Sequence, residues 1–294
     1  MYPHPTGSID GQDRPDQRER AAELHLPALE AAVDWLRNLL RTADGRDGAV
    51  RRVLDVGGAT GTATCLLARF FPNAEVVAVD RCAERLTRVA ARAGREHLGT
   101  RVRTHRVGQP FQVAPLADAD VIWGGDVTQH AGDQQAALDR LAAALRPGGL
   151  LAVVEPGLAP RFLPREIGMG RPGLQARLDC AVDDELAAQR ARLPGCTTVV
   201  EDWPALLARA GLVPTGSRTF LVDVPAPLDL PAREYLYDHL TWLRDQVGGR
   251  LDPADRETLN HLLDGDACTG ILWRPDAFYL AALTVHTART CRRA

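Results

Sequence analysis

The chain has 294 residues, a net charge of −3 and an apolar content of 45%. These values are typical of one large globular domain, or of a domain with a substantial insertion. The basic residues are scattered, so nucleic acids and anionic membranes are poor partners on electrostatic grounds. No stretch has the pattern of a signal peptide or of a membrane span, and the cysteines lack C-x-x-C spacing. We therefore expect a soluble cytoplasmic protein with free thiols and no metal site.

The N-terminal part, residues 1–48, is expected to be a helical cap. After a polar start, we expect an amphipathic helix that ends near Arg41, because apolar side chains recur at helical spacing: Leu29, Val33, Leu36 and Leu40. Such a helix either covers a ligand site or only packs on a sheet, and the pattern leaves both open.

A short apolar strand then runs from Val53 directly into a glycine turn that ends at Gly61, and a helix opens at about Thr62. A strand, a glycine turn and a helix N-terminus together form a ligand site at the carboxyl edge of an α/β sheet. A Walker-type phosphate-binding loop is excluded, because it requires a Lys and the chain has none. A dinucleotide fingerprint also fails, because Thr62 stands where its last Gly would be.

The turn reads acid-x-Gly-x-small-x-Gly, with Asp55, Gly57, Ala59 and Gly61 at the defining positions. This pattern resembles the first motif of the class I S-adenosylmethionine (SAM) methyltransferases, in which Gly usually stands at the position of Ala59. The alternative is an ordinary tight turn between a strand and a helix.

A second buried strand, residues 74–80, ends at Asp80. A carboxylate at this place can accept hydrogen bonds from both ribose hydroxyls of a nucleoside, although it also serves as a plain cap for the next helix. A third strand, residues 102–107, leads into Gly108-Gln109-Pro110-Phe111. In the family this segment meets the adenine, usually with an acid where Gln109 stands. Pro110 has no N–H to offer.

A fourth strand, residues 120–125, is followed by Asp126 and His130, and then by a helix over about 133–145. A Leu-Arg-Pro-Gly-Gly turn precedes a fifth strand, residues 150–154, which ends at Glu155. This turn is a second feature that resembles the methyltransferase family. His130 is the candidate base, with a loose resemblance to phenolic O-methyltransferases, whereas a His that only lines the pocket is the alternative. Asp126 and Glu155 are the other candidate acids or bases.

The resemblance implies a Rossmann-like class I methyltransferase fold, an α/β fold with a seven-stranded, mostly parallel sheet and added lid helices. It implies S-adenosyl-L-methionine as cofactor, held by the following residues: Asp55, Gly57, Gly58, Ala59, Thr60, Gly61, Asp80, Arg81, Gln109, Pro110, Phe111 and Gly125.

We expect the α/β core to occupy residues 49–230, with a helical insertion near 157–200. Two further helices over 231–270 come before the final core strand and tail, residues 271–294, where the family has a tight hairpin. We expect these helices to form a lid, with peripheral decoration or a dimer surface as the alternative. Aromatic residues of the helical segments are candidates for an apolar acceptor pocket: Trp35, Tyr235, Tyr237 and Trp242. The histidines there, His25, His239 and His261, are expected to be surface or packing residues.

The expected function is SAM-dependent methyl transfer to a small molecule of specialised metabolism, with O-methylation slightly favoured over N- and C-methylation. An enzyme that binds SAM but catalyses a cyclisation or rearrangement is the first alternative. A non-catalytic binding module is the second. The sequence names neither the acceptor nor the oligomeric state, and a homodimer is left open.

Overall fold

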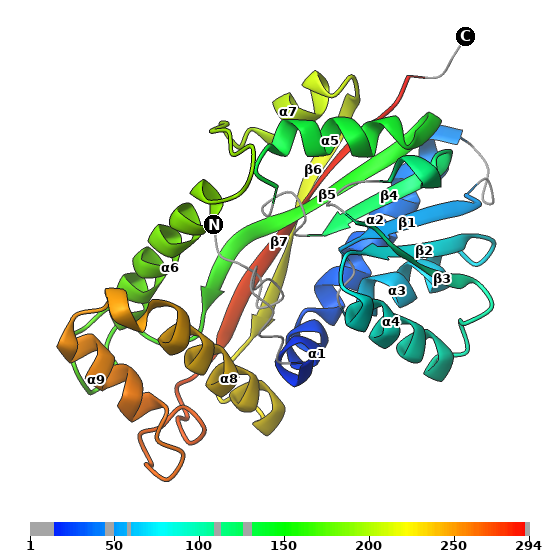
Figure 1. Ribbon diagram of the computed structural model, residues 1–294. Coiled ribbons are helices and arrows are strands. Elements are labelled where there is room, and N and C mark those ends of the chain that lie inside the picture. The colour runs from blue at the N-terminus through cyan, green and yellow to red at the C-terminus, as the bar shows by residue number, and fades with distance from the viewer. Residues whose placement is uncertain (1–14, 45–49, 58–59, 109–112, 126–130, 292–294) are drawn as a thin grey trace. The chain divides into compact units, whose positions relative to one another are not determined.

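A computed structural model describes residues 15–44, 50–57, 60–108, 113–125 and 131–291. Its strands form one seven-stranded sheet in the order β3-β2-β1-β4-β5-β7-β6 (Figure 1). The pairs β3–β2, β2–β1, β1–β4 and β4–β5 are parallel. The predicted α/β fold with a seven-stranded, mostly parallel sheet is therefore confirmed.

The parallel strands form where short apolar runs allow burial on both faces. They are β1 (Arg52–Val56), β2 (Glu75–Asp80), β3 (Val102–Arg106) and β4 (Ala119–Gly125). Strand β1 lies in the centre, with Asp55 paired to Ala78 on one side and Trp123 on the other. Because these strands are parallel, their carboxyl ends meet at one edge of the sheet.

Amphipathic helices connect these strands. Helices α3 (Thr62–Phe70) and α4 (Ala83–Arg95) pack on β2 and β3, and α2 (Leu26–Asp44) packs on α3. The short 3₁₀ helix η1 (Ala114–Leu116) precedes β4. Helix α5 (Gln134–Ala143) contacts α7 (Trp203–Arg209). Asp133 caps α5, since its side chain accepts a hydrogen bond from the N–H of Ala136 at 2.9 Å.

Strand β5 (Leu145–Arg161) is longer at both ends than the predicted strand. The Arg-Pro-Gly-Gly turn lies inside it as an irregularity, because Ala119 pairs with Leu145 and Val121 already pairs with Leu150. A side chain at Gly149 would place its Cβ 2.9 Å from the carbonyl oxygen of Ala119, so the bulge requires glycine. The expected strand end at Glu155 is wrong. The continuous burial of the strand ends at Glu155. The continuation of the strand is partly exposed, and no apolar pattern in the sequence predicts it.

The last two strands, β6 (Val213–Val224) and β7 (Tyr279–Arg289), are antiparallel neighbours. Hydroxyl pairs cross between them, Thr215 with Thr287 at 2.8 Å and Thr219 with Thr284 at 2.9 Å. The expected helices lie between these strands in the chain: α8 (Leu230–Val247), the 3₁₀ helix η3 (Gly248–Arg250) and α9 (Pro253–Leu262).

The chain forms two compact units. Unit 1 contains residues 1–25, 156–192 and 221–282, and unit 2 contains residues 26–155, 193–220 and 283–294. In unit 1, α1 (Pro15–Leu24) and α6 (Leu174–Ala191) both pack on α8. The core of unit 2 is apolar and is drawn from β1, β2, β4, β5, α5 and α7.

Candidate functional site

Asp55 lies near the carboxyl end of β1, in the centre of unit 2, and is 1% exposed. The hydroxyl of Thr64, in the first turn of α3, donates to its Oδ2, whereas Oδ1 has no hydrogen-bond partner among the described residues. Burial raises the pKa of Asp55 to about 6, although the bond from Thr64 opposes that shift. An unpartnered buried carboxylate oxygen at this edge can accept a hydrogen bond from a ligand.

The glycine turn follows directly, with Gly57 at φ 89° and Gly61 at φ 76°, both in the left-handed region that favours glycine. The N–H of Gly57 donates to the carbonyl of Val79 at 3.0 Å, which ties the turn to β2. A Cβ on Gly61 would lie 3.1 Å from the Cα of Val89, so α3 and α4 approach closely there. Gly58 and Ala59 lie outside the described residues.

Asp80 ends β2 at the same edge of the sheet. Its Oδ1 accepts a hydrogen bond from the N–H of Cys82 at 2.8 Å, and its Oδ2 lies 3.7 Å from Arg85. The first contact fixes the turn before α4, whose N-cap is Cys82, so Asp80 does not cap that helix as the sequence had left open. Because that contact uses one oxygen only, the carboxylate retains capacity for ribose hydroxyls.

The other predicted site residues are less fully described. Gly125 ends β4 and is half-buried, and Arg81 follows Asp80 on the surface. Gln109, Pro110 and Phe111, together with the candidate bases Asp126 and His130, lie outside the described residues. Glu155 is buried inside β5 rather than at a strand end.

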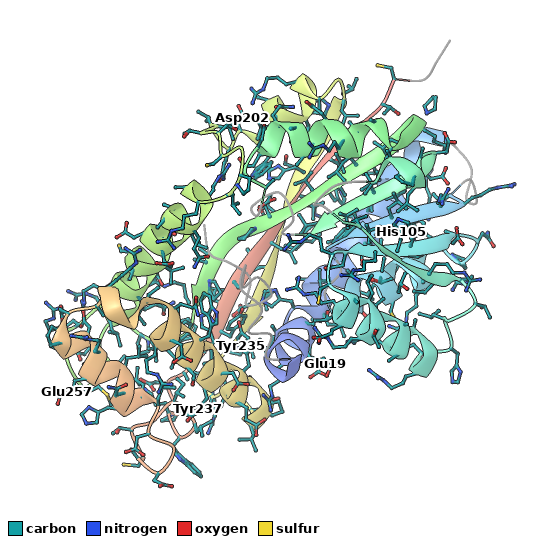
Figure 2. All side chains as sticks on the ribbon, in the orientation of Figure 1. Glu19, His105, Asp202, Tyr235, Tyr237 and Glu257 are labelled. Carbon is teal, nitrogen blue, oxygen red and sulfur yellow. The ribbon has the colours of Figure 1, made fainter. Side chains whose placement is uncertain are left out.

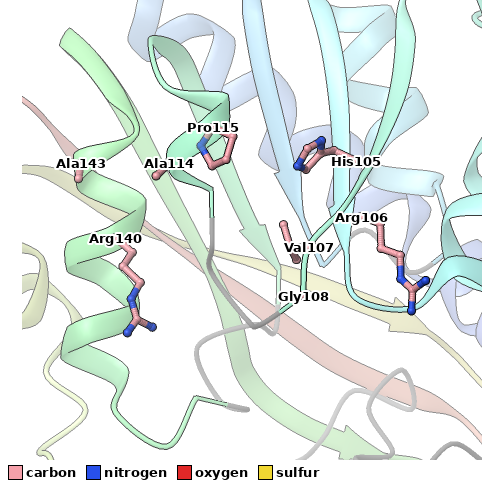
Figure 3. Close-up of a pocket in the computed structure, with 8 residues that line it drawn as sticks. All are labelled: His105, Arg106, Val107, Gly108, Ala114, Pro115, Arg140 and Ala143. Carbon is pink, nitrogen blue, oxygen red and sulfur yellow. The ribbon is translucent and has the colours of Figure 1, made fainter.

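A cavity of about 620 Å³ opens on unit 2 beside the end of β3. Figure 3 shows His105 pointing from β3 toward Pro115, with Arg140 extending from α5. Its lining includes Gly108 but neither Asp55 nor Asp80. The cavity therefore adjoins the predicted adenine segment without containing the carboxylates of the site.

Unit 1 contains a buried group of rings that sequence reasoning only partly found. His25 and His239 are buried rather than on the surface, whereas His261 is exposed as expected. Tyr235 is fully buried, and its neighbour Tyr237 on α8 is half-buried (Figure 2). Tyr279 was missed because a single tyrosine in an apolar strand carries no motif.

The remaining aromatic candidates lie apart. Trp35, in unit 2, packs against Phe220 with ring centroids 6.0 Å apart. Trp242 is half-buried on α8 and stacks on His239. Among the described residues no group of His, Cys, Asp and Glu could hold a metal ion, and no helix has the length and apolar character of a membrane span.

Residues 54–151 match the protein family described as a methyltransferase domain. The match contains the glycine turn and Asp80, and the strand order is that of the class I SAM-dependent enzymes. The chain thus carries a class I SAM-dependent methyltransferase domain, and S-adenosyl-L-methionine is the cofactor of that family. The residues present fit this cofactor, since Asp55 has a buried oxygen without a hydrogen-bond partner in the described part of the chain, beside a turn with two left-handed glycines.

Several curated relatives are trans-aconitate 2-methyltransferases. One from Rhodopseudomonas palustris strain BisA53 is 29% identical over 200 residues, which cover 63% of this chain and 74% of the relative. One from Paracidovorax citrulli is 31% identical over 160 residues, or 54% and 57% of the two chains. One from Rhodopseudomonas palustris strain BisB18 is 34% identical over 107 residues, so this chain spans 39% of its length.

A crystal structure from Bacillus halodurans C-125, provisionally assigned as a methyltransferase, has the same fold. It matches with a TM-score of 0.51 and 14% identity, over 86% of this chain and 97% of that one. At this identity the likeness concerns the fold alone.

Proposed function

We propose that the protein transfers a methyl group from SAM to a small-molecule acceptor. The observation that carries this proposal is the joint placement of Asp55, Gly57, Gly61 and Asp80 at the carboxyl ends of neighbouring parallel strands. Backbone N–H donors and carboxylate acceptors lie together at this edge of the sheet. Such a set can bind a nucleoside that carries an ammonium group.

SAM supplies an electrophilic methyl group on a sulfonium. The glycine turn would hold its amino acid part, and Asp80 would accept from the ribose hydroxyls. Arg81, Gln109, Pro110 and Phe111 would lie near the adenine, and Gly125 would line the site. The protein's own contribution is alignment and exclusion of water, which can supply several kcal/mol of the barrier.

For an acceptor hydroxyl, a base must take up the proton. We propose His130 for this role, with Asp126 and Glu155 as alternatives, and O-methylation as the leading reaction. The similarity to trans-aconitate methyltransferases adds polycarboxylates to the acceptor classes to be tested, beside natural products. A cytoplasmic location and a small-molecule partner belong to the same proposal.

Calorimetric titration with S-adenosylhomocysteine (SAH) tests the cofactor site. The variant is Asp80→Asn, because its amide oxygen can still accept from Cys82 while the second ribose acceptor is lost. We expect micromolar binding by the wild type and roughly 10- to 100-fold weaker binding by the variant. The matched control Asp139→Asn, at an exposed position of α5, should bind like the wild type.

Each outcome has a separate meaning. No SAH binding by the wild type would contradict the proposed function. Equal binding by wild type and Asp80→Asn would contradict only the ribose role of Asp80. Product mass then distinguishes the reactions, since methyl transfer adds one methylene and a rearrangement leaves the mass unchanged.

A further inference from the structure

The cavity beside the end of β3 lies on one face of the sheet of unit 2. In the parallel pair of β2 and β3, Val79 pairs with His105 and Asp80 pairs with Arg106. Paired residues of neighbouring strands point to the same face, and successive residues of one strand point to opposite faces. His105 therefore shares its face with Val79, which belongs to the same apolar core as residues of α5.

The two carboxylates of the expected cofactor site point to the other face. Asp55 pairs with Ala78, which lies two residues before Asp80 on β2, so both carboxylates are on the same side of the sheet. The partner of Asp55 is Thr64 of α3, and α3 packs on α4 rather than on α5. The cavity is therefore separate from the carboxylates, although Gly108 at its rim leads into the expected adenine segment.

A short connection explains why a cavity is present here. On the face of the carboxylates, α3 and α4 cover β2 and β3. On the opposite face, the described part of the connection from β3 to β4 contains one short helical element, η1, and α5 follows only after β4. The space between β3 and α5 is bordered by small apolar side chains: Val107, Ala114, Pro115 and Ala143.

Two nitrogen-bearing side chains lie on opposite sides of this apolar space. His105 points from β3 toward Pro115, and Arg140 extends from α5 (Figure 3). None of the eight described residues that line the cavity is acidic. Arg106 is also part of the lining, but its side chain begins on the other face of β3, and its Nε donates to the carbonyl of Arg81 at 3.1 Å.

Arg140 is the cation that this cavity offers to a ligand. Its guanidinium has no hydrogen bond or ion pair with another described residue. The adjacent Asp139 does not face it along the helix and instead accepts from Gln135 Nε2 at 2.9 Å. The positions three and four residues away from Arg140 are all alanines, so α5 supplies no partner: Ala136, Ala137, Ala143 and Ala144.

His105 adds a second polar group to the same space. It is half-buried and has no hydrogen bond with another described residue. A neutral imidazole keeps one N–H donor in either tautomer, and its ring gives a flat surface for another ring. An exposed arginine alone would indicate nothing, whereas Arg140 borders a cavity with apolar walls, an unengaged imidazole and no acidic side chain.

These features define the chemistry of a ligand. A guanidinium binds a carboxylate through two parallel hydrogen bonds. One guanidinium neutralises one negative charge, which favours a monocarboxylate over a phosphate monoester, whose charge is close to −2. The apolar walls favour a compact ring next to the carboxylate, and the volume of about 620 Å³ lies within the range of small-molecule sites.

We propose that this cavity binds a small aromatic monocarboxylate, with its carboxylate on Arg140 and its ring against the apolar wall and the imidazole of His105. The site is distinct from the cofactor site. The inference goes beyond the proposed function and does not depend on it.

Matched probes test this inference on the full chain. 2-Naphthoate and 2-naphthol are titrated by calorimetry at neutral pH, where they share a ring system and differ in carboxylate against neutral hydroxyl. We expect 2-naphthoate to bind at least about tenfold more tightly than 2-naphthol, because only the carboxylate forms a charge-assisted pair with Arg140. Saturating SAH should change the affinity for 2-naphthoate by less than about twofold, since the two sites lie on opposite faces.

Variants assign the preference to Arg140 and His105. Arg140→Gln should weaken 2-naphthoate binding about tenfold and leave 2-naphthol unchanged, whereas Arg140→Lys keeps the charge without the planar fork and should be intermediate. His105→Ala should weaken both probes about threefold, because the ring surface is lost. The matched control Arg103→Gln removes the same charge at an exposed position of β3 outside the lining, and should bind 2-naphthoate within about twofold of the wild type.

Binding of neither probe, or equal or tighter binding of 2-naphthol, would overturn the inference. Wild-type affinity for 2-naphthoate in Arg140→Gln would do the same. Loss of 2-naphthoate binding in saturating SAH would assign the cavity to the cofactor site and would also overturn it. The titrations without SAH decide the inference even for a protein that binds no SAH, so its failure and the failure of the proposed function remain distinguishable.

Discussion

At the scale of single residues, the cofactor site depends on a carboxylate kept where water cannot reach it. Asp55 is enclosed by the central strands, and the hydroxyl of Thr64 satisfies only one of its oxygens. Such a group costs folding free energy when it ionises, and ligand binding can repay that cost. The apo protein is therefore expected to show this cost as a dependence on pH.

The first prediction concerns Asp55→Asn. The folded-state pKa of Asp55 is raised from 3.8 to about 6, so between these values the folded state binds more protons than the unfolded state. The contribution of Asp55 to stability thus falls as pH rises from about 4 to 6. The variant does not titrate there and should gain on the order of 2–3 kcal/mol relative to wild type between pH 4 and pH 7.

Urea unfolding of both proteins at pH 4 and pH 7, followed by circular dichroism, measures this difference. The comparison with wild type removes the effect of other titrating groups, because they are common to both proteins. A stability difference that is equal at the two pH values would contradict the raised pKa of Asp55.

The residues of the glycine turn in unit 2 could be predicted from the sequence because they are close together in the chain. Asp55, the glycine turn and Thr62 follow one another, and a strand end with a left-handed turn has a composition of its own. The pair His25 and Tyr279 could not be predicted, since 254 positions separate them and neither belongs to a motif. Buried pairs of this kind depend on tertiary packing that one sequence does not display.

At the scale of elements, the buried strands were predicted, whereas the exposed continuation of β5 was not. β1, β2 and β4 have continuous apolar runs, so both their place and their order could be read. The outer part of β5 beyond Glu155 is exposed and carries no such run. This segment extends by pairing with its neighbours rather than by its own hydrophobic pattern.

A second prediction concerns the attachment of α9 in unit 1. Asp255 is 2% exposed in its side chain, and Arg177 holds it through Nε at 2.6 Å and Nη2 at 2.8 Å. Arg177→Ala leaves that buried carboxylate poorly compensated, so we expect a loss of about 2 kcal/mol in stability. Arg171 also contacts Asp255 at 2.9 Å but is largely exposed, so Arg171→Ala should cost less than about 1 kcal/mol.

Chemical denaturation of the two variants provides the measurement, with Arg256→Ala, at an exposed position of α9, as a control for loss of an arginine. Equal losses in Arg177→Ala and Arg171→Ala would show that the geometry at Asp255 does not decide the stability of this helix.

At the scale of the whole molecule, the predicted cofactor residues belong to one of the two compact units. They lie in unit 2, whereas the buried rings of His25, Tyr235, His239 and Tyr279 lie in unit 1. Strands β5, β6 and β7 contribute residues to both units, so neither unit is a continuous stretch of chain. The order of elements along the sequence therefore does not reveal which residues belong to which unit.

Hydrogen exchange can test this division directly. A ligand present at about 100 times its Kd stabilises the state that it binds by about 2.7 kcal/mol, which corresponds to roughly 100-fold slower exchange of amides that open with that state. We expect SAH to slow exchange mainly in unit 2, around Gly57, Thr62 and Cys82. Exchange measured by mass spectrometry on peptic fragments separates these regions from unit 1, and slowing by SAH that is confined to unit 1 would contradict the placement of the cofactor at the glycine turn.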